Sequence, residues 1–271
     1  MNYVESAHAF QTYLKGYDQK NEKVRLKIVH TFGVVRQADE ICRRMSLSAE
    51  DRELAKVIAL LHDIGRFEQL KRFDSFEPTT MDHAAYGVQV LFEEGMIRQF
   101  VPETTWDDII RTAIARHSDF ILETIGDPRT LLHARLIRDA DKLDNFRVRL
   151  EDDLTTFLGM TAEEIGSQKI SPAVCEAVMQ DHCVLSANRV TKIDYWVSYL
   201  AHVFDINFKE SLDIIAENDY LSRTVRRIPY SDPETARQMA ELLVHAKAYM
   251  ERIRKTFSSC RSECTPQRSP R

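Results

Sequence analysis

Several features that would reveal a protein's class are missing from this sequence of 271 residues. None of its apolar stretches approaches the roughly 20 residues that a membrane-spanning helix requires, and the first residues show no signal-peptide pattern. The five cysteines are scattered, odd in number and free of C-x-x-C spacing, which argues against a disulfide framework or a zinc ribbon. There is also no glycine-rich phosphate loop, no internal repeat and no strand-rich block. We therefore expect a cytoplasmic protein without a membrane anchor.

The overall charge of the chain is too small to give it a strong electrostatic field of either sign. The net charge is −5 and the pI is near 6.0, so nothing in the composition favours nucleic acid or membrane lipid as a partner. With 44% hydrophobic and 29% charged residues, the chain is long enough to bury a sizeable core. We expect a small-molecule partner.

Apolar residues recur at intervals of three or four along most of the chain, which predicts an all-α fold. Val24, Ile28, Phe32 and Val35 show this pattern in the helix expected over 21–44. Further helices are expected over 1–20, 48–63, 83–95, 105–117, 132–140 and 234–255. Ser48 with Asp51, and Thr105 with Asp108, resemble capping boxes that would start two of them, and residues 71–80 are expected to form a loop.

The adjacent residues His62 and Asp63 at the end of one helical run form the first candidate site. Neighbours on a helix are about 100° apart, so both side chains can reach one metal ion. For a His-Asp pair taken alone, a buried histidine held by its neighbour's carboxylate is the commoner explanation, and the other histidines and aspartates of the chain favour the metal. Gly65 is expected to turn the chain here. Arg66 then follows, and it would be either a guanidinium that binds phosphate oxygens through two hydrogen bonds or a surface arginine.

Two later residues are expected on buried helix faces. His117 follows apolar neighbours by three and four positions, and Asp141 follows Ile137 by four. A buried imidazole or carboxylate needs a partner. A metal ion is one candidate. The alternative partner of His117 is a backbone carbonyl. The alternative partners of the acidic cluster formed by Asp141 and Asp144 are Arg138, Arg147 and Arg149.

Four imidazoles and two carboxylates make up the complete candidate set: His30, His62, Asp63, His83, His117 and Asp141. Such donors suit Mn or Fe, and also Co, Ni or Zn, better than Mg or Ca. Six ligands exceed what one ion with open positions would use. Two ions about 3.5–4 Å apart, bridged by one carboxylate, fit the number of ligands.

The order of these residues resembles the HD superfamily: His, then His-Asp, then two more His, and finally Asp within Ala140-Asp141-Lys142-Leu143-Asp144. The resemblance covers about Val24–Leu150. It implies an all-helical core that hydrolyses phosphate esters at a mononuclear or binuclear metal site. It also implies that His30, His62, Asp63 and Asp141 are the ligands common to the superfamily, that Asp63 bridges, and that His83 and His117 bind the second metal.

This resemblance implies a metal-dependent phosphohydrolase in which a metal-activated water attacks a phosphate mono- or diester, with nucleotides among the candidates. Asp63 and Arg66 would be catalytic, and Asp144 would contact the substrate or support a ligand from behind. Ser118-Asp119-Phe120 stands where cyclic-dinucleotide phosphodiesterases have a second histidine, and no Gly-Tyr-Pro follows. Cyclic-di-GMP is therefore not the expected substrate.

Two other functions use the same residues. Some HD proteins are oxygenases that hold a mixed-valence di-iron pair, and a helical sensor domain could keep metals for stability alone. We expect one domain over 1–257, with its metal-binding core at about 21–150 and a helical extension at about 151–257. A tail over 258–271, rich in Ser, Arg, Pro and Cys, is expected to be disordered. Helical surfaces of this kind often pair, so a homodimer is a further expectation.

Overall fold

Helices form all the regular structure of the described chain, as expected for an all-α protein. The computed structural model describes residues 1–77 and 79–263, with side chains through residue 257, and no strand occurs among them. The chain divides into two compact units, Met1–Met160 and Thr161–Arg271. We describe each by itself; the single domain expected over 1–257 stays a prediction.

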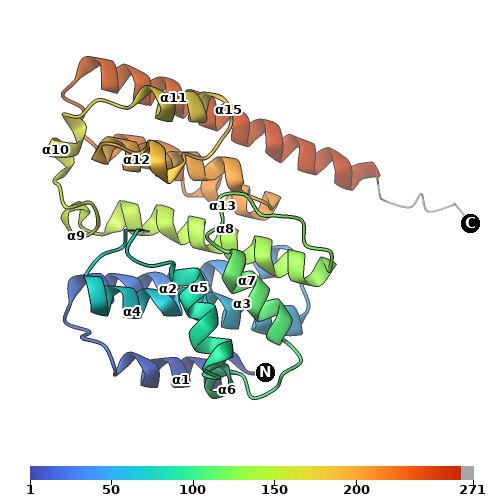
Figure 1. Cartoon of the computed structure of the whole chain (residues 1–271). Coiled ribbons are helices and arrows are strands. Elements are labelled where there is room, and N and C mark those ends of the chain that lie inside the picture. The colour runs from blue at the N-terminus through green and yellow to red at the C-terminus, as the bar shows by residue number, and fades with distance from the viewer. Residues whose placement is uncertain (78, 264–271) are drawn as a thin grey trace, which may run out of the picture. The chain divides into compact units, whose positions relative to one another are not determined.

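The first unit is built around three helices that pack together, α2 (Glu22–Arg44), α3 (Ala49–Leu61) and α8 (Pro128–Glu151) (Figure 1). Each begins at a residue whose side chain accepts backbone hydrogen bonds. Asn21 accepts from two amides of α2, Ser48 from Asp51 of α3, and Asp127 from Thr130 of α8. The predicted start of α3 at Ser48 is confirmed. These helices carry predicted ligands from distant parts of the chain.

Shorter helices complete the first unit: α1 (Tyr3–Leu14), α4 (Ile64–Phe73), α5 (His83–Val88), the π-helical turn η1 (Gln89–Glu93), α6 (Ile97–Phe100), α7 (Asp107–Arg116) and α9 (Leu154–Leu158). α5 packs against α4 and α7, and α7 packs against α8. The remaining three ligand-bearing segments, α4, α5 and α7, are thereby linked to α2 and α8, because α4 also packs against α2.

Three predicted boundaries in this unit are wrong. The loop expected over 71–80 begins three residues later, because α4 continues to Phe73 and ends only at Asp74, where φ is +44°. Lys71 and Arg72 are polar but favour the negative end of the helix dipole, and Arg72 also pairs with Glu68 at 2.7 Å.

A second incorrect boundary is the start of α7. Trp106, and not Thr105, precedes the first helical residue, and it offers no capping hydrogen bond. Asp107 and Asp108 instead place two carboxylates at the positive end of the helix, which favours a start at this point. The helix expected over 1–20 also ends earlier, at Leu14.

The second unit contains α10 (Ala162–Gly166), α11 (Pro172–Met179), η2 (Ser186–Asn188), α12 (Lys192–Leu200), η3 (Ala201–Asp205), α13 (Lys209–Glu217), α14 (Tyr220–Arg226) and α15 (Pro233–Glu263). The long α15 packs against α11, α13 and α14. Trp196 is fully buried in this unit, and its Nε1 donates to the carbonyl of Thr224 at 3.1 Å. Residues 258–263 belong to α15, so the disordered tail expected there is wrong for them; 264–271 lie outside the described residues.

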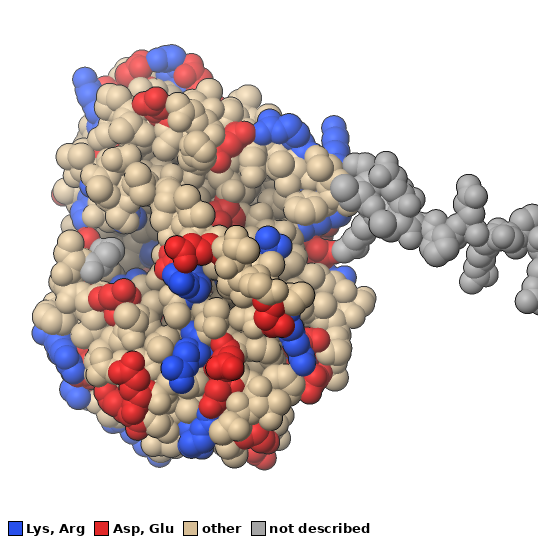
Figure 2. All heavy atoms as spheres, turned by 45° about the vertical axis from the view of Figure 1, so that its right-hand side comes forward, with Lys and Arg blue, Asp and Glu red and all other residues tan. Residues whose placement is uncertain are grey.

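The hydrophobicity of the helices and the distribution of surface charge agree with the composition. No helix in the described part of the chain is both long enough and apolar enough to cross a bilayer. On the face drawn in Figure 2, lysine and arginine side chains lie among aspartate and glutamate side chains. That face shows no extended area of one sign.

Candidate metal centre

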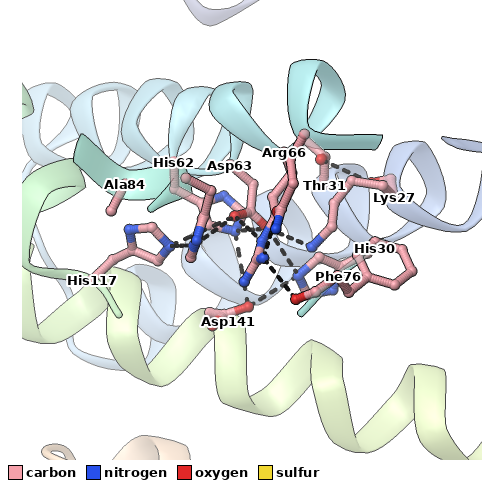
Figure 3. A network of polar contacts seen from close by, with 12 residues as sticks. Lys27, His30, Thr31, His62, Asp63, Arg66, Phe76, Ala84, His117 and Asp141 are labelled. Atoms are coloured by element: carbon pink, nitrogen blue, oxygen red, sulfur yellow. Dashed lines mark hydrogen bonds and ion pairs between the residues drawn. The ribbon is translucent and has the colours of Figure 1, made fainter. Parts of the chain in front are cut away.

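All six predicted ligands lie together inside the first unit. Figure 3 labels His30, His62, Asp63, His117 and Asp141. Two groups of donors are close enough to hold an ion, His30 with His62 and Asp141, and His62 with Asp63 and His117. His83 joins them, since its Nε2 lies 3.3 Å from Oδ1 of Asp63. The residues come from α2, α5, α8 and the ends of α3, α4 and α7.

The carboxylate of Asp63 lies between two sets of imidazoles. Its Oδ2 is 3.2 Å from Nε2 of His62 and 3.9 Å from Nε2 of His30. Its Oδ1 is 3.3 Å from Nε2 of His83 and 3.6 Å from Nε2 of His117. Each oxygen therefore faces its own pair of nitrogens.

Each set is completed by contacts within it. Oδ1 of Asp141 lies 3.0 Å from Nε2 of His30 and 3.8 Å from Nε2 of His62. On the other side, Nε2 of His83 and Nε2 of His117 are 3.2 Å apart. Ligands bound at about 2.0–2.2 Å from one ion are separated from each other by about 3–3.5 Å. The shorter donor spacings lie within this range, so they fit two transition-metal ions.

Among the six predicted ligands, two buried side-chain atoms have no hydrogen-bond partner in the described part of the chain, Nε2 of His62 and Oδ1 of Asp63. Buried polar atoms without a partner are rare, because desolvating them costs free energy. A metal ion bound on each side of Asp63 would satisfy both atoms. The donor set and these unpartnered atoms thus fit the metals implied by the sequence.

Hydrogen bonds to Nδ1 of two rings, His62 and His117, direct their Nε2 atoms toward Asp63. Nδ1 lies 2.7 Å from the Ala59 carbonyl in His62 and 2.7 Å from the Ile114 carbonyl in His117. A carbonyl oxygen only accepts, so Nδ1 carries the proton and Nε2 keeps its lone pair for a metal. The carbonyl partner proposed as the alternative for His117 is present, and it accompanies the Nε2 contact instead of replacing it.

Gly65 acts differently from the prediction that it turns the chain. It lies inside α4, and a Cβ built on it would come within 2.2 Å of the His83 carbonyl oxygen. Its missing side chain therefore lets α5 approach α4 closely. This contact carries His83, the first residue of α5, to Asp63.

Asp144 supports His30 from behind. Its carboxylate is fully buried, and its Oδ2 lies 2.9 Å from Nδ1 of His30. Arg147 donates to both oxygens, at 2.7 and 3.1 Å. With no exposed surface, Asp144 fits the supporting role and not the substrate contact, and Arg147 pairs with it instead of with Asp141.

Arg138 fixes the turn that presents His117. From inside the core, its Nη1 donates to the carbonyls of Arg116, His117 and Asp119, at 3.0, 3.3 and 2.7 Å. The last carbonyls of a helix have no partner within it. Arg138 supplies that partner at the end of α7.

Two cations border the cluster. Nζ of Lys27 pairs with Oδ2 of Asp63, and Nε of Arg66 lies 3.7 Å from Oδ1. Arg66 also donates from Nη1 to Oε1 of Gln69 at 2.7 Å and to the Phe76 carbonyl at 3.1 Å. Lys27 was absent from the predicted site, although it precedes His30 by one helical turn, a spacing that places both on one face.

The surroundings set the protonation states of two of the predicted ligands, Asp63 and His83. Burial raises the pKa of Asp63, but the positive charge of Lys27 and the contacts with His62 outweigh this effect and hold that pKa well below its usual range. Burial, reinforced by Arg66, holds the pKa of His83 well below its usual value. Asp63 is therefore ionised and His83 neutral at neutral pH, the forms that bind metals.

A protein-family model described as HD domain matches residues 28–145. This segment is an HD domain. It contains all six predicted ligands, and HD domains are generally metal-dependent phosphohydrolases. Lys27 and Arg147 lie just outside the HD domain, before its start and after its end. No curated protein and no solved structure was found to match the chain.

Proposed function

We propose that the protein is a metal-dependent phosphohydrolase that cleaves a small phosphate mono- or diester, with nucleotides among the candidate substrates. The observation that carries this proposal is the position of Asp63, with each carboxylate oxygen facing a different pair of imidazole nitrogens. A carboxylate between two donor sets is the arrangement that a pair of ions sharing a bridging ligand requires.

Two divalent ions, Mn or Fe first and Co, Ni or Zn otherwise, would supply an activated water and polarise the phosphoryl oxygens. His30, His62 and Asp141 would hold one ion, and His83 and His117 the other. Asp63 would bind both. Hydrogen bonds on Nδ1 keep three of the imidazoles in fixed orientations, so these ligands need not reorganise during the reaction.

The exposure of the ligands indicates where a substrate would enter. The side chain of Asp141 is 23% exposed, whereas those of His62 and Asp63 are 0% and 5% exposed. A phosphate ester would therefore approach from the side of Asp141. Arg66 would stabilise the negative charge on the phosphoryl oxygens, because its Nε and Nη2 make no hydrogen bond among the described residues and could donate to those oxygens.

The test is hydrolysis of a panel of phosphomonoesters and phosphodiesters by purified protein with Mn(II) or Fe(II), under anaerobic conditions. We expect turnover by the wild type and a loss of at least about 100-fold in Asp63→Ala, together with reduced metal content. Asp39→Ala is the matched control, since it removes a carboxylate of α2 that pairs with Arg52 outside the cluster. An Asp63→Ala protein with both metals and full activity would refute the assignment.

The same assay separates the alternatives. A protein that binds two irons, hydrolyses no ester and consumes oxygen with a substrate would be a di-iron oxygenase. A protein that binds metal tightly and turns over nothing, with or without oxygen, would be a metal-stabilised sensor. Both outcomes contradict the proposal.

A further inference from the structure

Lys27 and Arg66 approach the same carboxylate from different elements. Lys27 comes from α2 and reaches Oδ2 of Asp63, and Arg66 comes from α4 and lies nearest Oδ1. Figure 3 shows both side chains beside Asp63, with Phe76 next to them. Their side chains are only 13% and 16% exposed, so their charges are weakly screened by solvent.

The charges of the cluster balance without any metal. Asp63 and Asp141 contribute two negative charges, and Lys27 with Arg66 contributes two positive charges. The remaining buried carboxylate, Asp144, is matched by Arg147. Two divalent ions would therefore leave an excess of four positive charges, which calls for an anionic ligand.

Metal binding would also release Lys27 from its present partner. Its Nζ pairs with Oδ2 of Asp63, the oxygen that faces His30 and His62. An ion held by these residues would draw on the same oxygen, which weakens the pair with Lys27. An ammonium group has three N–H donors, and these then become available to another acceptor.

Arg66 has free donors in a fixed position. Its Nη1 is held by Gln69 and by the Phe76 carbonyl, and Gln69 is itself fully buried. Nε and Nη2 remain for a ligand, and a planar guanidinium matches two oxygens of a phosphate. The Phe76 ring centroid lies 5.9 Å from Nζ of Lys27, so one loop residue contacts both cations.

We propose that Lys27 and Arg66 together bind the oxyanion of the substrate's phosphoryl group at the metal-loaded centre, with Lys27 as a substrate-binding residue. This inference rests on the proposed function and names the side chains that recognise its substrate. Lys27 pairs with Asp63 in this structure and would pair with a phosphoryl oxygen at the loaded centre.

The test uses the full chain in three variants. Lys27→Met removes the charge and keeps the length of the side chain, and Lys27→Arg keeps the charge. Lys23→Met is the matched control, one turn earlier on α2, where Nζ pairs with the exposed Asp74 at 2.7 Å. Each protein is titrated calorimetrically with Mn(II), and the loaded protein is then titrated with inorganic phosphate.

We expect all variants to bind two Mn(II) ions, and Lys27→Met to bind them at least as tightly as the wild type. Its affinity for phosphate should fall about 10- to 100-fold, as expected for the loss of a charge-assisted hydrogen bond. Lys27→Arg should lie within about threefold of the wild type, because its guanidinium keeps the charge and the donors. Lys23→Met should match the wild type.

Three outcomes would overturn the inference. Unchanged phosphate affinity in Lys27→Met would do so, and ester hydrolysis by the wild type would still support the proposed function. Loss of Mn(II) binding in Lys27→Met would show that Lys27 holds the ligands in place instead. If loaded wild-type protein binds no phosphate the inference fails, and the proposed function fails with it only when the ester panel is also silent.

Discussion

Replacing Gly33 with alanine should damage the metal centre although the residue is no ligand. Gly33 lies on α2, three residues after His30, and a Cβ built on it would come within 1.9 Å of Oδ1 and 2.5 Å of Oδ2 of Asp144. Contacts this short cannot persist, so the carboxylate must move. It is fully buried and bound by His30 and Arg147, and movement would break those bonds.

The expected change in the free energy of unfolding combines one stabilising effect and two destabilising effects. Alanine in place of glycine inside a helix stabilises it by about 1 kcal/mol. Overpacking a core costs about 1–3 kcal/mol, and losing one hydrogen bond to a charged group costs about 1.5–3 kcal/mol. The net loss is about 1.5–5 kcal/mol, which for a unit of this size lowers the melting temperature by about 3–20 °C. The loss of the support for His30 should weaken metal binding about 10- to 100-fold.

Thermal unfolding and a Mn(II) titration of Gly33→Ala measure these two effects. Gly126→Ala is the control, because a Cβ there meets no atom within 4 Å. Helix propensity alone predicts a melting temperature above that of the wild type, so the sign of the change is decisive. A Gly33→Ala protein as stable as the wild type, with unchanged metal affinity, would refute the role assigned to Asp144.

Two further predictions concern stability. Burial raises the pKa of Asp194, but hydrogen bonds from Ser171, Val190 and Thr191 outweigh this effect and hold that pKa below its usual value. Asp194→Asn should therefore lower the free energy of unfolding by about 2 kcal/mol. The pKa of Asp194 is lower in the folded than in the unfolded protein, so the stability difference between wild type and Asp194→Asn is complete above about pH 4 and shrinks as the pH falls through the folded pKa. Urea unfolding at several pH values measures this difference. An equal difference at all pH values would contradict the prediction. Mn(II) at 100 times its dissociation constant should stabilise the first unit by about 2.7 kcal/mol. EDTA should reverse this stabilisation, and Asp63→Ala should not show it. An unchanged melting temperature would contradict a structural contribution of the ions.

The candidate site could be predicted as far as it depends on local sequence. Ser48 as the start of α3, and the inward faces of His117 and Asp141, follow from helical period and capping, which involve only near neighbours. Among the incorrect predictions are those for Gly65 and for the loop over 71–80. Glycine and charged residues are compatible with both helix and turn, and packing or end effects decided between them.

The types and order of six candidate ligand residues, and the helices that carry them, were determined by the sequence alone. Only the tertiary structure decided which oxygen of Asp63 faces which imidazoles and which side chains support them. His30 depends on Asp144, which is 114 residues away, and Asp63 pairs with Lys27, which is 36 residues away. Helical periodicity indicates the face on which a residue lies, but the partner of that face depends on how α2, α4 and α8 pack. This packing is set by the shapes of many side chains together, and no local pattern encodes it.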